Sequence, residues 1–552
     1  MSYLCLSGGR VVDPTNDVDQ VADVWILDGS IVAAPDEAAQ SLQGVRRIDV
    51  SGQVVMAGAI DMHCHIAGSK VNAARMMMPH LNRKSIEQCR QFDKQWFHSG
   101  HMGAVPSLFT TGYKYTGLGY TTCFDAAISP LAARHAHHDF NIIPGVDTGF
   151  FTLVGNNHYV MQSAADGNQK AMQNFLAWLL SKVGSYAPKV VNPGGVELWK
   201  QKRTGNARDL DQNIDGFNTT PRKILQSIAE AANAIGLPHP VHIHTNNLGL
   251  PGNWETTLGT MESLAGLRAH LTHIQFHSYG GGDESESSLC SKVAPLAQVI
   301  NANPELSVDV GQVMFGPSMS MTGDGPLGYY LQQIGAEKWY SADAEIESGC
   351  GVSPIEYRDR NFVHSLQWAI GLEWYLSVKN PWQVVMSTDH PNGGSFMAYP
   401  QIIRLLMDRS FRDEMLARVN PKVLEFSGLK DMTREYSLSE IAIITRSGPA
   451  RLLGLSQKGH LGVGADADIA VYRVDDNKET MFAVPRYVIK SGQILVEDFE
   501  IRNVVHGKTL TTHREFDVAA QGEIEAWFSQ QYSVAPESYG VEKGEFANRL
   551  NS

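Results

Sequence analysis

Eight short apolar runs, each ending in polar or glycine-rich residues, follow one another through the middle of the chain and constrain its fold more than any other feature. They are "VVMAGAIDMHCH", "LGYTTCFDAAI", "FNIIPGVDTGF", "APKVVNPGG", "HPVHIHTNN", "AHLTHIQFHSYGG", "LSVDVGQVMFG" and "WQVVMSTDHPN". Helical patterns such as "NQKAMQNFLAWLLSKVGSY" separate many of them. Strands that alternate with helices form parallel sheets, so eight such repeats predict an α/β fold built on a (β/α)8, TIM-like barrel.

The two ends of the chain are β-rich, with short alternating strands and glycine-containing turns. We expect them to meet in one small composite β-sandwich domain, with residues 1–58 as its N-terminal half and 453–518 as its C-terminal half. The barrel then covers residues 59–452, and 519–552 form a C-terminal extension that could serve a partner or another subunit. The segment from Met76 to about Gly119 is longer than an ordinary βα connection and is predicted to be a lid or substrate wall.

Composition excludes several classes of protein. The formal net charge of −13 gives no electrostatic reason to expect binding to nucleic acid or to an anionic membrane. The six cysteines are spread out with no Cys-x-x-Cys pair, which speaks against an iron–sulfur cluster and suits a reducing compartment. The sequence shows no signal peptide and no long apolar span, so we expect a cytoplasmic protein.

The predicted strand ends carry a set of side chains that bind metals. His63 and His65 lie on one face of the first strand, because successive side chains of a strand point to opposite faces. Later strands contribute Lys189, His242 and His244, His273 and His277, and Asp389. In a barrel of this type the carboxyl ends of the strands surround one active site. A single His-x-His pair is more often structural, but together these residues predict a metal centre.

Some of these assignments have close alternatives. His242 and His244 share a face, and we favour His244 because it lies nearer to the strand end. We favour His277 over His273 because the glycines after it allow close backbone approach, while His273 stays a possible ligand. Lys189 could instead be a surface lysine at the start of a strand. Asp389 could instead cap a helix before "PNGGSF".

The arrangement of these residues resembles the amidohydrolase superfamily. The resemblance implies zinc, with two ions, bound by His63, His65, Lys189, His244, His277 and Asp389. It also implies that Lys189 is carboxylated by CO₂, since a carbamate can bridge two cations where a free ammonium group repels them; Asn192 is the alternative if no carbamate forms. Asp389 would be the catalytic residue, taking a proton from the attacking water and passing it to the leaving nitrogen.

Several longer motifs narrow the resemblance to the A subunits of formylmethanofuran dehydrogenases and, more closely, of bacterial formyltransferase/hydrolase complexes. They include "VNPGGVELWK", "HIHTNNLGLPGNW", "TTGYKYTGLGYTT" and "TDHPNGGSF", and the similarity runs from about Leu4 to about His513. The resemblance implies hydrolysis of the linear C–N bond of an N-formyl group on a methanofuran-type cofactor, within tetrahydromethanopterin-linked one-carbon metabolism. It implies partner subunits in a hetero-oligomer, which would carry formyl transfer.

Other functions remain open at this point. An archaeal-type dehydrogenase subunit would run formate condensation instead, beside partners with tungsten or molybdenum. Further alternatives are a freestanding cyclic-amide hydrolase and a non-catalytic scaffold subunit. We expect substrate contacts from Tyr113, Lys114 and Tyr115, although these residues could equally pack a wall. The basic run 200–203 is a candidate for anionic glutamates of the cofactor, but such a run is more commonly a solvated surface.

Overall fold

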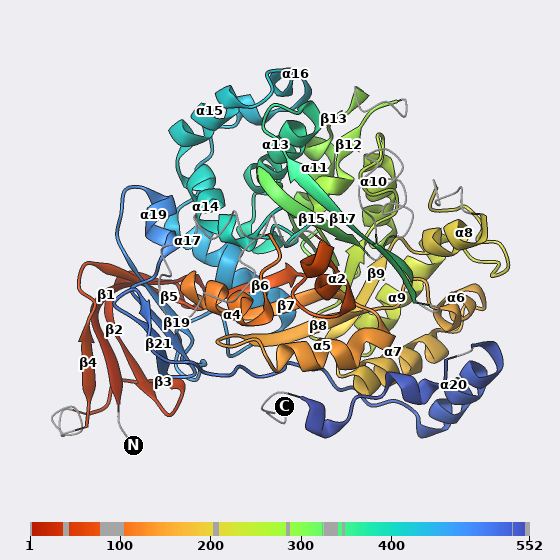
Figure 1. Cartoon of the computed structure of the whole chain (residues 1–552), viewed down its shortest axis with the longest axis horizontal. Helices are drawn as coiled ribbons and strands as arrows, with labels where there is room; N and C mark the ends of the chain where they lie inside the picture. The colour runs from red at the N-terminus through yellow and green to blue at the C-terminus, as the bar shows by residue number, and fades with distance from the viewer. Residues whose placement is uncertain are drawn as a thin grey trace.

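The computed structural model of the chain describes residues 3–36, 44–77, 104–202, 209–282, 288–322, 324, 340–344, 348–532 and 534–546 (Figure 1). Two larger sheets organise these residues. One is the barrel sheet in the middle of the chain, and the other combines strands from its two ends.

The barrel sheet contains eight strands, and every neighbouring pair in it is parallel. Its order along the sheet follows the chain, from β6 (Ala59–Cys64), β7 (Tyr120–Ile128), β8 (Asp147–Leu153) and β9 (Ala187–Val191) to β10 (Val241–His244), β11 (Ala269–Leu271), β14 (Leu306–Asp309) and β18 (Val384–Val385). A parallel bridge between Cys64 and His390 joins the two ends of the sheet. Each predicted apolar run contains or overlaps one of these strands, with the run 140–150 covering only the first part of β8, so the predicted barrel is confirmed.

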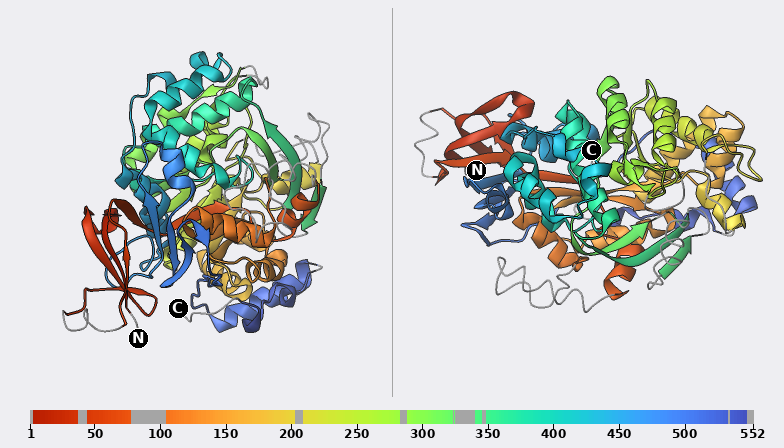
Figure 2. Two further views of the ribbon diagram at one scale, coloured as in Figure 1. Left: turned by 60° about the vertical axis from the view of Figure 1, so that its left-hand side comes forward. Right: turned by 90° about the horizontal axis from the view of Figure 1, so that it is seen from above.

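Helices surround the barrel, as the two views of Figure 2 show. Their ends follow local capping rules: α9 (Pro221–Ala234) begins with a proline behind Thr220, whose side chain accepts a hydrogen bond from the Lys223 amide, and α7 (Gln169–Val183) ends at Gly184 with φ 64°. No helix among the described residues is long and apolar enough to cross a bilayer. The other main helices are α4 (Leu108–Gly117), α5 (Ala133–Phe140), α6 (His158–Ala165), α8 (Gly195–Lys202), α10 (Trp254–Ser263), α11 (Val293–Ala302), α13 (Phe362–Ser377), α14 (Tyr399–Met407), α15 (Arg409–Arg418), α16 (Val423–Phe426), α17 (Leu438–Ala442), α18 (Gly448–Leu453) and α19 (Lys478–Ala483).

Strands from both chain ends share one nine-stranded sheet, visible at the left of Figure 1. The N-terminal end supplies β1 (Leu4–Asp13), β2 (Val18–Leu27), β3 (Ser30–Val32), β4 (Arg46–Asp49) and β5 (Gln53–Ala57), and the C-terminal end supplies β19 (Ile469–Arg473), β20 (Tyr487–Lys490), β21 (Gln493–Glu497) and β22 (Glu500–Ile501). The two groups join where β5 pairs antiparallel with β19. The residue limits of the domains stay predictions.

A three-stranded antiparallel sheet lies between β14 and β18 in the chain, and we call it the roof sheet. It consists of β15 (Gly316–Thr322), β16 (Tyr340–Ala344) and β17 (Ser348–Tyr357), with β17 in the middle. Helix α2 (Ser69–Met77), which follows β6, packs against it. The lid predicted between Met76 and Gly119 falls largely on residues 78–103, which lie outside the described residues.

The C-terminal extension contacts the chain's own barrel. Helix α20 (Val518–Gln531) lies beside α7, and Ile524 and Phe528 on it are buried (Figure 1). Farther on, the Glu545 carboxylate pairs with Arg134 on α5 at 3.0 Å. At least this part of the extension therefore belongs to the chain's own fold.

A buried cluster of charges ties the composite sheet to the barrel. Lys490 of β20 places Nζ 2.7 Å from Asp147 Oδ2 on barrel strand β8 and 2.8 Å from Asp468 Oδ2. Lys458 Nζ lies 2.6 Å from Asp147 and 2.9 Å from Asp468, and it also reaches Asp466 at 2.8 Å. Both lysines are at least nine-tenths buried. Since each charge has opposite partners, the loss of one leaves others unpaired in a low-dielectric interior.

We expect Lys490→Met to lower the stability of the protein by about 3–5 kcal/mol, because it leaves buried carboxylates short of a counter-charge. The urea midpoint of unfolding measures this loss. The matched control is Arg358→Met, which removes the cation of an exposed pair with Glu356 and should change stability by less than about 1 kcal/mol. Equal midpoints for the two variants would contradict a stabilising role for the cluster.

Candidate functional site

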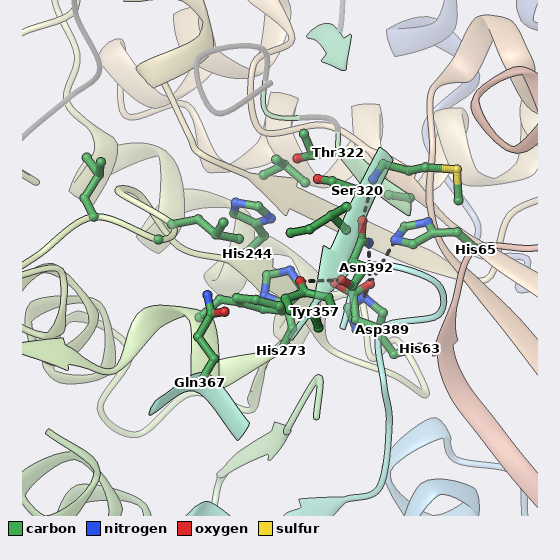
Figure 3. Close-up of a pocket in the computed structure, with 18 of the residues that line it drawn as sticks. His63, His65, His244, His273, Ser320, Thr322, Tyr357, Gln367, Asp389 and Asn392 are labelled. Carbon is green, nitrogen blue, oxygen red and sulfur yellow. Dashed lines mark hydrogen bonds and ion pairs between the residues drawn. The ribbon is translucent and has the colours of Figure 1, made fainter. Parts of the chain in front are cut away.

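A cavity of about 220 Å³ opens at the carboxyl ends of the barrel strands. Figure 3 shows several of its residues converging from different strands. Its polar members include most of the residues predicted from the strand ends, and its apolar lining residues include Leu250, Phe276 and Ile355. The polar members are His63, His65, Lys189, His244, His273, Ser320, Thr322, Tyr357, His364, Gln367, Asp389 and Asn392.

The two histidines of the first strand meet the aspartate after the last strand. Asp389 Oδ1 lies 3.0 Å from His63 Nε2 and 3.1 Å from His65 Nε2. Asp389 has φ 50°, a left-handed backbone conformation that non-glycine residues adopt at a cost, and His273 and Asn192 at other strand ends share it. Such conformations gather where a fold over-determines the position of functional side chains.

A second group consists of His244, His273 and His277, whose ligand atoms lie within 4.8 Å of one another. His273 also belongs to a group with His63 and Asp389, so it connects the two. His277 is fully buried, with Nδ1 2.8 Å from Thr245 Oγ1, and it is not among the cavity residues. The structure therefore brings both His273 and His277 close to the other candidate ligands. His273 is the more central of the two, because it belongs to both groups and lines the cavity.

Lys189 on β9 also reaches the cavity, and it is almost completely buried. Its Nζ donates a hydrogen bond of 3.2 Å to Thr272 Oγ1. Burial lowers the pKa of Lys189 to about 7, because an ammonium group loses its hydration there. A large share of this amine is therefore neutral near neutral pH, and its burial excludes the interpretation of Lys189 as a surface lysine.

Beneath the cavity lies a polar layer whose central residue, Asp309, sequence reasoning missed. Asp309, at the end of β14, places Oδ2 2.8 Å from His63 Nδ1 and 3.2 Å from His270 Nε2. Its Oδ1 accepts hydrogen bonds from Ser387 Oγ at 2.6 Å and from the His273 amide at 3.0 Å. Asp309 thus holds the ring of His63 so that Nε2 faces Asp389. The sequence pattern could have indicated this residue, because "LSVDVG" places Asp309 at the end of a predicted barrel strand.

Two carboxylates dominate the electrostatics of His63. Burial alone would lower the pKa of His63, but Asp309 and Asp389 outweigh it and raise this pKa to about 9. Burial would likewise raise the pKa of Asp309, but His63 and His270 hold it well below its usual range. His242 extends the layer, with Nε2 3.1 Å from His63 Nδ1 and Nδ1 3.0 Å from His239 Nε2.

The sequence analysis also did not identify two other acidic residues near the site, Asp125 and Asp324. Asp125 on β7 accepts hydrogen bonds from the Ile66 and Ala67 amides at 2.8 and 3.0 Å, and its Oδ1 lies 3.6 Å from His65 Nδ1. It thereby holds the chain as it leaves β6. Asp324, just beyond β15, lies 3.4 Å from His244 Nε2 and accepts a hydrogen bond of 3.0 Å from Asn192 Nδ2. The alternative ligand Asn192 is therefore engaged with this carboxylate.

The residues expected to contact substrate lie elsewhere in the described structure. Tyr115 is buried, donates a hydrogen bond of 2.7 Å to Asp61 and stacks on Phe396 with ring centroids 3.8 Å apart. Lys114 is buried and Tyr113 is half-buried, and none of the three lines the cavity. Their contact with substrate stays a prediction. In the basic run 200–203, Lys200 pairs with Glu197 at 3.5 Å.

The donors at the site suit a zinc ion. Imidazole and carboxylate are common zinc ligands, and burial holds the pKa of His273 and of His277 well below the usual value, so both rings are neutral as metal binding requires. His273 Nδ1 and His277 Nε2 are buried and have no hydrogen-bond partner among the described residues. The acidic group Asp147, Asp466 and Asp468 differs, because lysines already neutralise it.

Comparison with known proteins gives a consistent picture. A sequence profile of the amidohydrolase family matches residues 46–496. Protein FwdA of Methanocaldococcus jannaschii is 40% identical, covering 99% of this chain and 98% of that protein. The A subunit of the formyltransferase/hydrolase complex Fhc of Methylorubrum extorquens is 38% identical, covering 98% of this chain and 97% of that protein.

Comparison with solved structures also finds similar folds. A chain in the crystal structure of the Methylorubrum extorquens complex FhcABCD with methylofuran has a TM-score of 0.90 and 37% identity, covering 99% of this chain and 97% of that one. A D-aminoacylase structure has a TM-score of 0.51 at 15% identity, covering 92% of this chain and 99% of its own, and that likeness concerns the fold alone.

We expect Asp309→Asn to weaken zinc binding about 10- to 100-fold, because His63 loses the carboxylate that orients its ring. Competition with a chelator of known zinc affinity measures the change. Asp498→Asn, which alters an exposed carboxylate paired with Arg486, is the control and should bind zinc as the unaltered protein does. Unchanged affinity in Asp309→Asn would show that the polar layer does not support the site.

Proposed function

The chain belongs to the amidohydrolase family, and we propose that it hydrolyses the N-formyl group of a methanofuran-type amine to formate and the free amine. The observation that carries the proposal is the set of histidines, lysine and aspartate gathered at one barrel mouth. The relative whose structure was solved with methylofuran matches along nearly its whole length, which supports the choice of substrate class.

The proposed metal is zinc, with two ions held by six side chains at the cavity. We now favour His273 over the expected ligand His277, because His273 lines the cavity and connects the two ligand groups; His277, in one group with His244 and His273, is the alternative. Bound zinc supplies a Lewis acid that polarises a carbonyl oxygen and lowers the pKa of water. Lys189 contributes as a carbamate, and its neutral amine is the form that reacts with CO₂. The six proposed ligands are His63, His65, Lys189, His244, His273 and Asp389.

The proposed hydrolysis requires proton transfer and exclusion of water, and different side chains serve these two roles. Water attacks the formyl carbon, the C–N bond breaks, and one proton must travel from the water to the departing nitrogen. Asp389 is the proposed carrier of that proton, since it is a buried carboxylate in contact with both histidines of the first strand. The apolar lining residues Leu250, Phe276 and Ile355 would exclude water around the amine portion of the substrate.

Assembly with other subunits forms part of the proposal. The complex FhcABCD contains the matching relative, and this chain covers almost all of it, so we expect a comparable hetero-oligomer in which other subunits carry formyl transfer. The 40% identity to protein FwdA favours a second candidate, in which the same residues condense formate with the amine. Purification of the native complex separates the two, because copurifying subunits with a molybdenum or tungsten pterin would select the second.

We expect Asp389→Asn to keep zinc at saturating concentration but to lower formate release from an N-formyl amine by about 100-fold or more, since an amide cannot carry the proton. Formate release and zinc content are measured on the same purified complex. An Asn variant with near-normal formate release would refute the assigned role. Release by zinc-free complex at the normal rate would instead favour a scaffold role for this chain.

We expect Lys189 to carry a carbamate that ¹³C NMR detects after exposure of the protein to ¹³C-labelled bicarbonate. The low pKa of the amine favours the reaction, because only the neutral form attacks CO₂. Lys189→Arg should lose the signal, whereas Lys223→Arg, at an exposed lysine on α9, should keep it. A spectrum without a carbamate in the zinc-loaded protein would leave Lys189 as a plain amine and contradict this part of the proposal.

A further inference from the structure

The segment that carries Asp389 is fastened to the roof sheet. Asn392 Oδ1 accepts a hydrogen bond of 2.5 Å from the Met321 amide on β15, and the Asn392 carbonyl accepts one of 2.7 Å from Tyr357 Oη at the end of β17. The Ser318 hydroxyl donates to the carbonyl of Pro391. Three contacts therefore connect residues 391–392 to two strands of the roof sheet.

The same asparagine reaches back to the candidate proton carrier. Asn392 Nδ2 donates a hydrogen bond of 2.9 Å to Asp389 Oδ1, the oxygen that also contacts His63 and His65 (Figure 3). The Asn392 amide additionally donates to the Asp389 carbonyl at 2.6 Å. One side chain thus uses its donor end on Asp389 and its acceptor end on the roof sheet.

The roof sheet in turn forms part of the cavity wall. Ser320, Met321 and Thr322 on β15 and Tyr357 on β17 all line it. A substrate held in the cavity would lie against the strands that hold Asn392. Because a carboxylate misplaced by about 1 Å can cost about 100-fold in rate, the fixing of Asp389 matters for proton transfer.

We propose that Asn392 is a positioning residue, which fixes Asp389 Oδ1 against His63 and His65 and couples this arrangement to the roof sheet over the substrate. The proposal rests on the proposed function for its kinetic part. Its structural part depends only on the hydrogen bonds of Asn392, which are present whichever reaction the site performs.

Asn392→Leu tests the role of the amide, because leucine has a similar volume and no hydrogen-bonding group. We expect kcat for formate release to fall about 10- to 100-fold with little change in KM, since only the alignment of the proton carrier is lost. The control is Asn303→Leu, between α11 and β14, where the side-chain amide donates to a backbone carbonyl at 2.8 Å. It should keep both constants.

A crystal structure of zinc-loaded Asn392→Leu supplies a readout that does not depend on the reaction. We expect the Asp389 carboxylate to have moved or rotated relative to His63 and His65 while the barrel is unchanged. If the wild-type complex released no formate, the proposed function would fail, but this carboxylate position would still decide the inference. An unmoved carboxylate, or a kcat equal to that of the wild type, would overturn it.

Tyr357→Phe tests the connection to the roof sheet by a milder change, the loss of one hydroxyl group. We expect kcat to fall by a few-fold to about 10-fold, in line with one lost hydrogen bond, and Asn392 to lie in a shifted position in the crystal. A variant with wild-type kcat and an unshifted Asn392 would show that the roof sheet does not hold Asp389, and would overturn the coupling.

Discussion

The placement of His63 between two carboxylates is the interaction on which the rest of the site depends. Asp309 from β14 holds Nδ1 and Asp389 after β18 meets Nε2, so one imidazole connects the first strand of the barrel with its last two. The bridge between Cys64 and His390 is the described backbone pairing at this seam. Side-chain contacts therefore help to close the barrel at the point where the candidate metal ligands lie.

Much of this architecture could be predicted from the sequence, because local patterns dictate it. The eight apolar runs each contain or overlap a barrel strand, and strand parity together with position at the strand end placed His63, His65, Lys189, His244 and Asp389 around one cavity. The choice between His273 and His277 was harder. Spacing gives both the same face of a strand, whereas β11 ends at Leu271 and His273 adopts a left-handed turn that no periodicity indicates.

Sequence reasoning recognised the polar layer only in part and did not recognise the roof sheet, for different reasons. His242 was named from the sequence and Asp309 ends a predicted strand, but apolar side chains are the usual filling of a barrel, so the joint role of these residues and His270 becomes evident only when their partners are known. The roof sheet depends on antiparallel pairing between segments that flank a long connection. The hydrogen bond between Met321 of this sheet and Asn392 joins residues 71 positions apart in the chain, and no local sequence pattern predicts such a contact.

The composite sheet has a consequence for the order in which the protein can assemble. Strand β5 pairs with β1 on one side and with β19 on the other, and β19 comes more than 400 residues later in the chain. During synthesis, β5 keeps an open edge while the whole barrel emerges, and Asp147 lacks Lys458 and Lys490 until they follow. Open strand edges and unpaired buried charges invite misassembly. Nascent chains that have yet to release β19 and β20 are thus the ones for which a molecular chaperone matters most.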